Sequence, residues 1–430
     1  MLLDIDNERR EYAQRLFQCL MVSIRPLHVK ELAEILAIQF DRTELPRFNT
    51  SWRPDDAEYA VFATCSSLVA IVDRGGHDVV QFSHYSVKEY FMSERLGAAE
   101  EHLSYYRILP EPAHTILAHA SLSVLLHLDD TIDRETINYY PLAPYAARHW
   151  IDHAQFRGVS SHIQEVMECL FNPMRPHFAA WVWLYDIDRY WIRPMPTIHP
   201  MRPDAVPIYY AALSGFRDLV ERLIALHPQD VNRRGGSHAT PLHAALFKGN
   251  LEVASLLLEC GADPNSFDDQ GRAPLQVSRD AHLTMTQSSL EITRLLVSYG
   301  ANVDVTDDRG GTLLHAAARR GHRDIAELLL GFGASPDVRN RNQETPLHLA
   351  CGNGNVDVSR ILIERGSDIN SRDKNGFIPL QIASQFGHVG IAQLLLDCGS
   401  DANVHDIRRW TLLHYASFFF FFFFFLESSL

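Results

Sequence analysis

The sequence predicts a mainly α-helical protein in which a small mixed domain, a helical connector and a solenoid of helix-pair repeats follow one another. Three observations carry this prediction. The second half of the chain repeats itself with a period of 33 residues. The first hundred residues contain three helical patterns followed by a β-hairpin pattern. Between them, residues 101–203 consist of further helical stretches that end in a proline-rich segment.

The repeat fills residues 204–417. Clear copies begin at Thr240, Gly311, Thr345 and Ile378, and a divergent first copy reads "VPIYYAALSGFRDLVERLIALHPQDVN". The proline slot recurs every 33 residues except for one step of 39, whose six additional residues lie in "SRDAHLTMTQSS". The period and the Thr-Pro-Leu-His-x-Ala motif resemble those of ankyrin repeats. The resemblance implies a solenoid of about six helix pairs, followed by the fragment "TLLHYAS".

Each part of the motif has a structural role in a helix pair. Thr240 can cap the first helix through its hydroxyl, and Pro241 occupies the first helical position, where a missing N–H costs nothing. The glycine of "KGN" or "RGH" ends that helix, and leucine triplets such as 256–258 give the second helix a buried face. Because one repeat cannot bury its own apolar face, each packs against the next.

A histidine recurs within the motif, at His243, His315, His348 and His414. Ligands of one metal ion have to converge, whereas residues one repeat apart lie along a solenoid. Gln276 and Gln381 fill the same slot and suit hydrogen bonding better than metal binding. We therefore predict that these histidines hydrogen-bond near the capping threonine and that they bind no metal.

Residues 1–100 predict a winged-helix domain. Helical patterns cover "ERREYAQRLFQCLMVSI", "LHVKELAEILAIQF" and "DDAEYAVFATCSSLV", the last with Asp55 or Asp56 near its start. "LVAIVDRGGHDVVQF" is typical of a hairpin that turns at residues 74–76. Winged helices often bind DNA, but "DDAEYAVFATC" has three acidic residues and no basic one. Recognition helices carry Arg, Lys, Asn or Gln, so a winged-helix transcription regulator is the disfavoured alternative.

The stretch "VVQFSHYSVKEYF" places His84 where a strand passes into a helix. Residues 86–89 form a Ser-x-x-Glu capping box, which predicts that the helix begins about there. Backbone N–H groups at such an end favour an anion. His84 is therefore a candidate contact for a phosphate, if other residues hold that phosphate.

The segments "YAQRLFQCLMVSIRPLHVKELAEILAIQFD", "CSSLVAIVD" and "FSHYSVKEYF", within residues 8–96, resemble the winged-helix domain that follows the NTPase in NACHT-type STAND proteins. These are NLR-like signalling proteins, and fungi have many with C-terminal ankyrin repeats. The resemblance implies that His84, followed by Ser86, Glu89 and Tyr90, reaches the phosphate of bound ADP and helps to hold the resting state.

No G-x-x-x-x-G-K-S/T loop occurs in the chain, so the residues that would hold a nucleotide are not present. We expect the NTPase module to be absent from this chain, as in a product that lacks the switch module, and we expect no cofactor. The alternative is that the chain is the C-terminal fragment of a NACHT NTPase whose nucleotide switch lies upstream.

Residues 101–203 predict a packed helical connector. His149 and His153 lie four residues apart on one helical stretch, and His114 and His119 form another pair, which raises the possibility of a metal site. No Glu follows the first histidine as in H-E-x-x-H, and only two ligands are credible. We therefore predict a structural role for these histidines.

Composition limits the classes of partner. The net charge is −14, which argues against non-specific binding to nucleic acids or anionic membranes. The N-terminus lacks a secretory signal, and no run of 18 apolar residues predicts a membrane span. The six cysteines are scattered, which is typical of reduced residues in an intracellular protein. We expect a cytoplasmic location and neither nucleic acid nor membrane as partner.

Eight consecutive phenylalanines, Phe418 to Phe425, replace the expected end of the last first helix. A run of one aromatic residue has no amphipathic period. We predict that residues 418–430 are an unstructured tail.

The function that the sequence predicts is non-enzymatic protein interaction and signalling, with no catalytic residues. Partners of ankyrin repeats usually contact the first-helix face and the loop tips. The candidate partner-binding residues there are Phe247, Lys248, Asp308, Arg319, Arg320, Asn342, Lys374, Gln385 and Phe386. The sequence leaves the partner's identity and the oligomeric state open.

Overall fold

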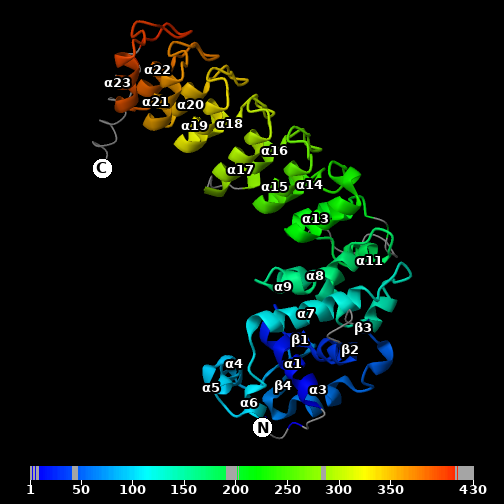
Figure 1. The fold of residues 1–430 in the computed structure, drawn as a ribbon. Helices are drawn as coiled ribbons and strands as arrows, with labels where there is room; N and C mark the ends of the chain where they lie inside the picture. The colour runs from blue at the N-terminus through cyan, green and yellow to red at the C-terminus, as the bar shows by residue number, and fades with distance from the viewer. Residues whose placement is uncertain are drawn as a thin grey trace. The chain divides into compact units, whose positions relative to one another are not determined.

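A computed structural model describes residues 2, 5, 9–40, 47–189, 201, 203–281, 287–411 and 414. The chain divides into two compact units, Met1–Ser237 and His238–Leu430. Figure 1 shows the helices and strands of each unit. Helices dominate both units, and strands occur in the first hundred residues, so the predicted fold class is confirmed. The phenylalanine tail lies outside the described residues, as does the insertion segment 282–286.

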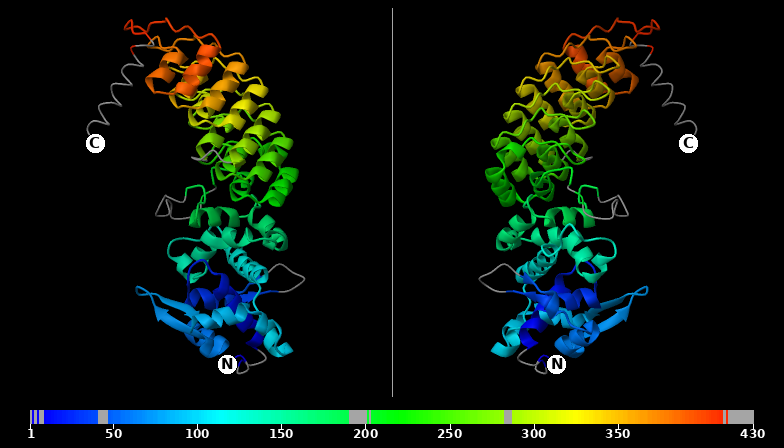
Figure 2. Two further views of the ribbon diagram at one scale, coloured as in Figure 1. Left: turned by 90° about the vertical axis from the view of Figure 1, so that its left-hand side faces the viewer. Right: turned by 90° about the vertical axis from the view of Figure 1, so that its right-hand side faces the viewer.

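The first unit begins with the winged-helix domain. Helices α1 (Arg10–Val22), α2 (Val29–Glu34) and α3 (Ala57–Cys65) pack together. Strands β4 (Val69–Asp73) and β5 (Asp78–Phe82) form the predicted hairpin, which lies at the edge of this unit in Figure 2. Strand β1 (Leu27–His28) adds to β5 with Leu27 opposite Val80, so the antiparallel sheet has the order β1-β5-β4. The side chain of Phe17 is fully buried in the core of this domain.

The second helix of this domain is shorter than predicted. Leu27 is a strand residue, and α2 ends at Glu34. The helical pattern continues only as a 3-10 turn, η3 (Ile35–Ala37), and the chain then enters strand β2 (Ile38–Gln39), which pairs with β3 (Arg47–Phe48). The apolar spacing alone did not show this pairing. The third helix is capped by Asp56, whose carboxylate accepts the N–H of Tyr59 at 2.9 Å.

The rest of the first unit is helical. Short elements of the winged-helix region and its C-terminal side are η4 (Thr50–Trp52), η5 (Ser66–Leu68), α4 (Tyr85–Met92), α5 (Glu94–Gly97) and α6 (Glu101–Ser104). The connector contains α7 (Pro110–Leu125), η6 (Thr136–Tyr139), α8 (Ala143–Ala154), α9 (Val159–His162), α10 (Gln164–Leu170) and α11 (His177–Leu184). The divergent first repeat consists of α12 (Pro207–Ser214) and α13 (Arg217–Leu226), followed by η7 (Pro228–Asp230).

The connector packs directly on the first repeat through an aromatic cluster. Trp150 and Trp181 are fully buried, with ring centroids 5.5 Å apart. Trp150 stacks on Phe216 of the repeat at 5.5 Å, and Trp181 meets Tyr210 of α12 edge-on at 6.1 Å. The indole N–H of Trp181 donates to the carbonyl of Ala147 at 3.0 Å. The connector therefore covers an apolar face of the first repeat, and the two belong to one compact unit.

The second unit is a stack of helix pairs (Figures 1 and 2). First helices are α14 (Pro241–Lys248), α16 (Pro274–Ala281), α18 (Leu313–Arg320), α20 (Pro346–Gly352) and α22 (Pro379–Gln385). Second helices are α15 (Leu251–Glu259), α17 (Gln287–Ser298), α19 (Arg323–Gly331), α21 (Val356–Glu364) and α23 (Val389–Asp397). Gly249 ends α14 in the left-handed conformation at φ 75°, the role predicted for the glycine of "KGN". These helices show the ankyrin repeats that the sequence predicted.

A buried hydrogen-bonded chain joins the winged-helix domain to the connector. The hydroxyl of Tyr145 accepts the N–H of Ile24 at 3.2 Å and lies 2.9 Å from Nε2 of His153. Nδ1 of His153 lies 2.9 Å from Nδ1 of His114. Burial, and then the neighbouring His114, lowers the pKa of His153 to about 3. His153 is therefore a neutral structural residue at pH 7.

We expect Trp181→Ala to lower the free energy of unfolding by about 3–5 kcal/mol, because it removes a fully buried indole from the aromatic cluster. Urea unfolding followed by circular dichroism measures this change. Met174→Ala is the matched control, since that side chain is 88% exposed and its loss should change stability by less than about 0.5 kcal/mol. A cost for Trp181→Ala as small as that of the control would contradict this packing.

The chain should lose stability as the pH falls below 6.5, partly because His153 must be protonated. Its folded pKa of about 3 lies below the ordinary value of 6.5, so the unfolded chain binds the proton more readily between these two values. Urea unfolding at pH 7 and pH 5 should show a smaller pH dependence for His153→Gln than for the parent.

Candidate functional site

The first helices of the second unit are fixed by one recurring side-chain bridge. Nδ1 of His348 accepts the N–H of the capping Thr345 at 3.1 Å, and Nε2 lies 3.1 Å from the carbonyl oxygen of Phe377 in the next repeat. Because a carbonyl only accepts, Nε2 carries the proton and the imidazole is neutral. His315 makes the same two contacts, to Thr312 at 3.1 Å and to the next repeat at 3.1 Å. The predicted hydrogen bonding near the capping threonine is confirmed.

Burial lowers the pKa of both His315 and His348, which keeps the imidazoles in the neutral form that this bridge requires. Glutamine performs the same task at position 381. Oε1 of Gln381 accepts the N–H of Ile378 at 3.1 Å, and Nε2 donates to the carbonyl of Trp410 at 3.3 Å. At the slot residue Gln276, Oε1 accepts the N–H of Ala273 at 2.8 Å, but the buried Nε2 has no hydrogen-bond partner.

The loop tips are held by a second recurring interaction. An aspartate or asparagine begins each tip, at Asp268, Asp307, Asn340, Asp373 and Asp406. Its side-chain oxygen accepts N–H groups two and four residues later, as Asp307 does from Arg309 and Gly311, both at 2.8 Å. Adjacent tips then join, because the N–H of Arg341 donates to the carbonyl of Arg309 at 2.9 Å. The side chains of the tips therefore stand in a fixed register.

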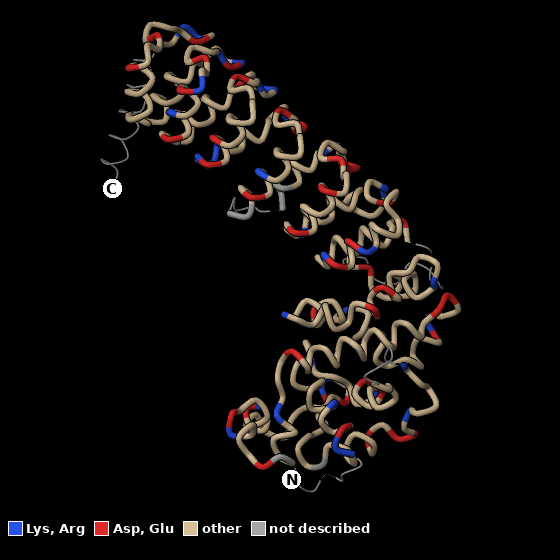
Figure 3. The backbone as a smooth tube through the Cα atoms, viewed as in Figure 1, with Lys and Arg blue, Asp and Glu red and all other residues tan. Residues whose placement is uncertain are grey.

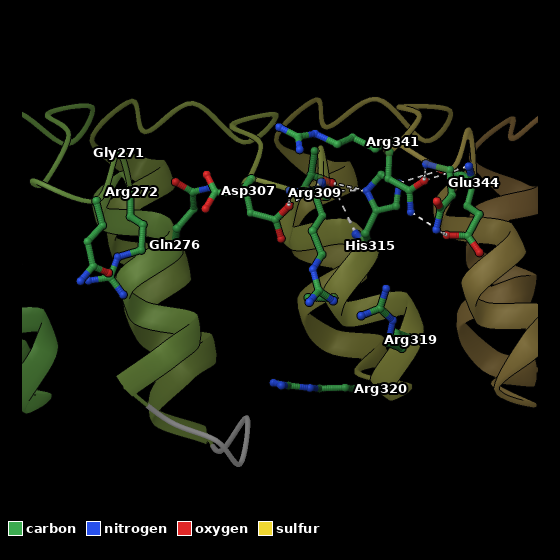
Figure 4. A pocket seen from close by; sticks show the side chains of 17 residues that line it. Gly271, Arg272, Gln276, Asp307, Arg309, His315, Arg319, Arg320, Arg341 and Glu344 are labelled. Carbon is green, nitrogen blue, oxygen red and sulfur yellow. Dashed lines mark hydrogen bonds between the residues drawn. The ribbon is translucent and has the colours of Figure 1, made fainter. Parts of the chain in front are cut away.

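A groove of about 860 Å³ opens on this face of the second unit. Residues of three consecutive repeats line it, within the ranges 270–276, 307–320 and 340–344. Figure 4 shows Arg309 and Arg341 at the loop tips, with Arg319 and Arg320 further down on α18. The groove is therefore a polar surface made by tips and first helices together.

Four of the nine residues predicted to bind a partner line this groove: Asp308, Arg319, Arg320 and Asn342. The other five, Phe247, Lys248, Lys374, Gln385 and Phe386, are exposed but lie outside it. Sequence reasoning missed Arg309, Arg341 and Gln276, which line the groove as well. The sequence did contain a signal for the position of the groove. The repeats that carry Gln276 and Arg319 are separated by the step of 39 residues instead of 33.

The guanidinium groups of Arg309, Arg319, Arg320 and Arg341 lack a carboxylate partner within the part of the chain that the structure describes. Arg272 differs, since it pairs with Asp268 at 2.8 Å. Glu344 accepts a hydrogen bond from Nδ2 of Asn340 at 2.8 Å. Charges of both signs occur along the tips (Figure 3). The groove contains these four guanidinium groups together with the exposed carboxylate of Asp308.

His84 in the first unit lies between strand β5 and helix α4, as the sequence predicted. Helix α4 begins at Tyr85 and its N-cap is His84, so the prediction that Ser86 begins a capping box was wrong. Nδ1 of His84 accepts the N–H of Ser86 at 3.2 Å and lies 2.7 Å from its hydroxyl. In the neutral imidazole the proton is then on Nε2. The cap thus leaves an exposed Nε2–H donor at the start of the helix.

The residues predicted as possible metal ligands serve other contacts. His114 and His153 belong to the buried chain with Tyr145, and His149 pairs with Asp152 at 2.9 Å. Within the described ranges, no three His, Cys, Asp or Glu side chains cluster as a metal site would require. The same ranges contain no helix with the length and apolarity needed to cross a membrane.

Comparison with known families identifies both parts of the chain. Models of ankyrin repeats match residues 208–286, 281–373 and 357–396. A model described as the winged helix domain of GPI inositol-deacylase matches residues 3–101. The chain therefore contains ankyrin repeats, which are protein-interaction modules, and a winged-helix domain of the GPI inositol-deacylase type.

Several curated proteins are similar to this chain. Azaphilone pigments biosynthesis cluster protein L of Monascus ruber is 28% identical over 280 residues, which are 61% of this chain and 58% of that protein. Alpha-latrocrustotoxin-Lt1a of Latrodectus tredecimguttatus is 36% identical over 72 residues, or 17% of this chain and 5% of the toxin. The chain thus spans less than two thirds of the length of these relatives.

Solved ankyrin structures are similar to about half of the chain. The ankyrin repeat domain of Bcl-3 matches with a TM-score of 0.45 at 24% identity, covering 50% of this chain and 95% of that domain. The human ASB11 ankyrin repeat domain matches with a TM-score of 0.40 at 27% identity, covering 49% of this chain and 91% of that domain.

We expect His348→Ala to lower the free energy of unfolding by about 1–3 kcal/mol, because it leaves the buried N–H of Thr345 without its partner and breaks the bridge to Phe377. His348→Gln should cost clearly less, since glutamine makes both contacts at position 381. Urea unfolding of the three proteins measures the difference. Equal stability of the alanine and glutamine variants would show that the bridge does not stabilise the array.

Proposed function

We propose that this chain is a non-enzymatic protein-interaction and signalling component, in which the ankyrin array binds a partner and an NLR-type winged-helix domain regulates the response. The observation that carries the proposal is the rigid face of first helices and loop tips. Its backbone and capping side chains are held by recurring hydrogen bonds, whereas Arg319 and Arg320 on this face extend unpaired. A surface that is ordered before binding loses little entropy when a partner docks.

The groove on this face is suited to recognition rather than catalysis. Four of its side chains are guanidiniums without a carboxylate partner, which stay protonated at any physiological pH and so serve poorly as general acids or bases. Its carboxylates, such as those of Asp307 and Glu344, accept hydrogen bonds from the loops that carry them. These contacts favour protein binding over an enzymatic function.

The regulatory part of the proposal rests on the winged-helix match and on His84. An exposed Nε2–H at a helix N-terminus is a suitable donor for a phosphate oxygen. We propose that His84 contacts a nucleotide phosphate when an NTPase module of the NACHT type is supplied. The second candidate function, a fragment of a NACHT NTPase, rests on the same match. A cytoplasmic location also belongs to this proposal, because the scattered cysteines do not form a disulfide pattern.

Co-purification from an extract of the host organism tests the binding function. Proteins retained by the full chain should be lost with Phe247→Ser/Phe386→Ser, which alters first-helix side chains that are 42% and 53% exposed. Val389→Ser is the control, since this residue is 77% exposed at the start of a second helix. Binding that is insensitive to the double variant would contradict a partner site on the first-helix face.

We expect this chain to bind ATP-Mg and ADP-Mg only weakly, because its sequence contains no P-loop and a helix-capping histidine cannot hold a nucleotide alone. Isothermal titration calorimetry with each nucleotide measures the affinity. Micromolar binding would contradict this expectation. If such binding occurs, His84→Ala shows whether the histidine takes part.

A further inference from the structure

The groove lies at the junction where the repeat spacing changes. Helix α14 packs closely on α16, α18 on α20 and α20 on α22, whereas α16 and α18 are packed much less closely. At this junction the spacing between the proline positions of consecutive repeats, Pro274 and Leu313, is 39 residues instead of 33.

An unpartnered polar group lies at this junction. The side chain of Gln276 is only 4% exposed, and its Nε2 has no hydrogen-bond partner. Its orientation is fixed at one end, because Oε1 accepts the N–H of Ala273 at 2.8 Å, as Oε1 of Gln381 accepts the N–H of Ile378. The equivalent Nε2 of Gln381 donates to a carbonyl of the next repeat at 3.3 Å. A buried donor without a partner is costly, so Gln276 is a site for an incoming acceptor oxygen.

Unpaired cations surround this donor along the groove. Arg309 and Arg341 extend from adjacent tips, and Arg319 and Arg320 lie along α18 (Figure 4). Arg309, Arg319 and Arg320 belong to one repeat and Arg341 belongs to the next. Helices in contact are about 8–10 Å apart, so three repeats span about 20 Å, the length of about six extended residues at about 3.3 Å each.

We propose that this groove binds an extended acidic segment of a partner protein, with a carboxylate or carbonyl oxygen of the segment accepting from Nε2 of Gln276 and neighbouring carboxylates pairing with Arg309 and Arg319. The inference rests on the proposed protein-binding function and specifies the chemistry of the partner. Carboxylates match guanidinium groups in bidentate geometry. The groove volume of about 860 Å³ is also far larger than one phosphate requires.

Nucleic acid is the less suitable polyanion. The chain carries a net charge of −14, and the exposed carboxylate of Asp308 lies in the groove itself. A phosphate backbone is repelled by such a surface, whereas a peptide can place acidic side chains only where arginines stand.

Fluorescence anisotropy with the full chain tests the proposal. The probe is a labelled ten-residue peptide that alternates Glu and Asp with Gly and Ser, and the matched probe carries Gln and Asn instead. We expect the acidic peptide to bind at least about tenfold more tightly, and we expect its affinity to fall as salt is raised from 0.05 to 0.5 M. Arg309→Glu/Arg319→Glu should weaken it at least about tenfold again. Arg360→Glu, at an exposed position of the second helix α21, is the control and should bind like the parent.

The variant Gln276→Glu tests how much the buried donor contributes to peptide affinity, apart from the contribution of the arginines. It keeps an oxygen for the N–H of Ala273 and replaces the unpartnered donor by a second acceptor, so it should weaken the acidic peptide about tenfold or more. Thermal unfolding verifies that this variant is folded. If it is not, the arginine variants decide the question.

Equal affinity for the neutral peptide, or unchanged binding in Arg309→Glu/Arg319→Glu, would overturn the proposal. Competition by low-millimolar inorganic phosphate would overturn it in favour of a small-anion site, and tighter binding of a single-stranded oligonucleotide would overturn it in favour of nucleic acid. If partners co-purify through the first-helix face but the acidic peptide does not bind, this inference fails while the broader function stands. If the acidic peptide binds but no partner co-purifies through the first-helix face, this inference stands while the broader function fails.

Discussion

The array depends on a hydrogen-bonded bridge between consecutive repeats. A neutral histidine or glutamine side chain joins the cap of one first helix to the backbone of the next repeat. His348 accepts the N–H of Thr345 at 3.1 Å and donates to the carbonyl of Phe377, 29 residues further along, at 3.1 Å. A protonated imidazole could not accept at Nδ1, so the bridge requires the lowered pKa that burial produces. Because the bridge satisfies two buried backbone groups at once, it fixes both the helix start and the register between repeats.

The same chemistry explains why one junction differs from the others. Gln276 makes the capping half of the bridge but not the half that reaches the next repeat. The loosely packed pair α16 and α18 then leaves a groove, and the tips beside it present Arg309 and Arg341. The bridge to the next repeat is present at His315 and missing at Gln276, and both residues line the groove.

In the first unit, the apolar outer face of the first repeat is covered by the connector. A terminal repeat needs a cover for its apolar face. Here the connector supplies it, with Trp150 stacked on Phe216 and Trp181 edge-on to Tyr210. The buried chain through Tyr145 and His153 links the same connector to the winged-helix domain. The winged helix, the connector and the first repeat therefore form one compact unit.

The sequence by itself determined the features that depend on local periodicity. The 33-residue period, the threonine cap at Thr240 and the hairpin β4–β5 follow from residue order, because caps and tight turns are satisfied within a few positions. Exposure of Arg319 and Arg320 followed from their place at the end of a first helix. Predictions from local sequence patterns were wrong at two places. The pairing of β2 with β3 shortens the second helix, and His84 instead of Ser86 caps helix α4. Only the tertiary structure decided that Arg309, Arg341 and Gln276 share a groove with Arg319, because the distance between neighbouring repeats depends on packing across a junction and not on the spacing of residues within either repeat.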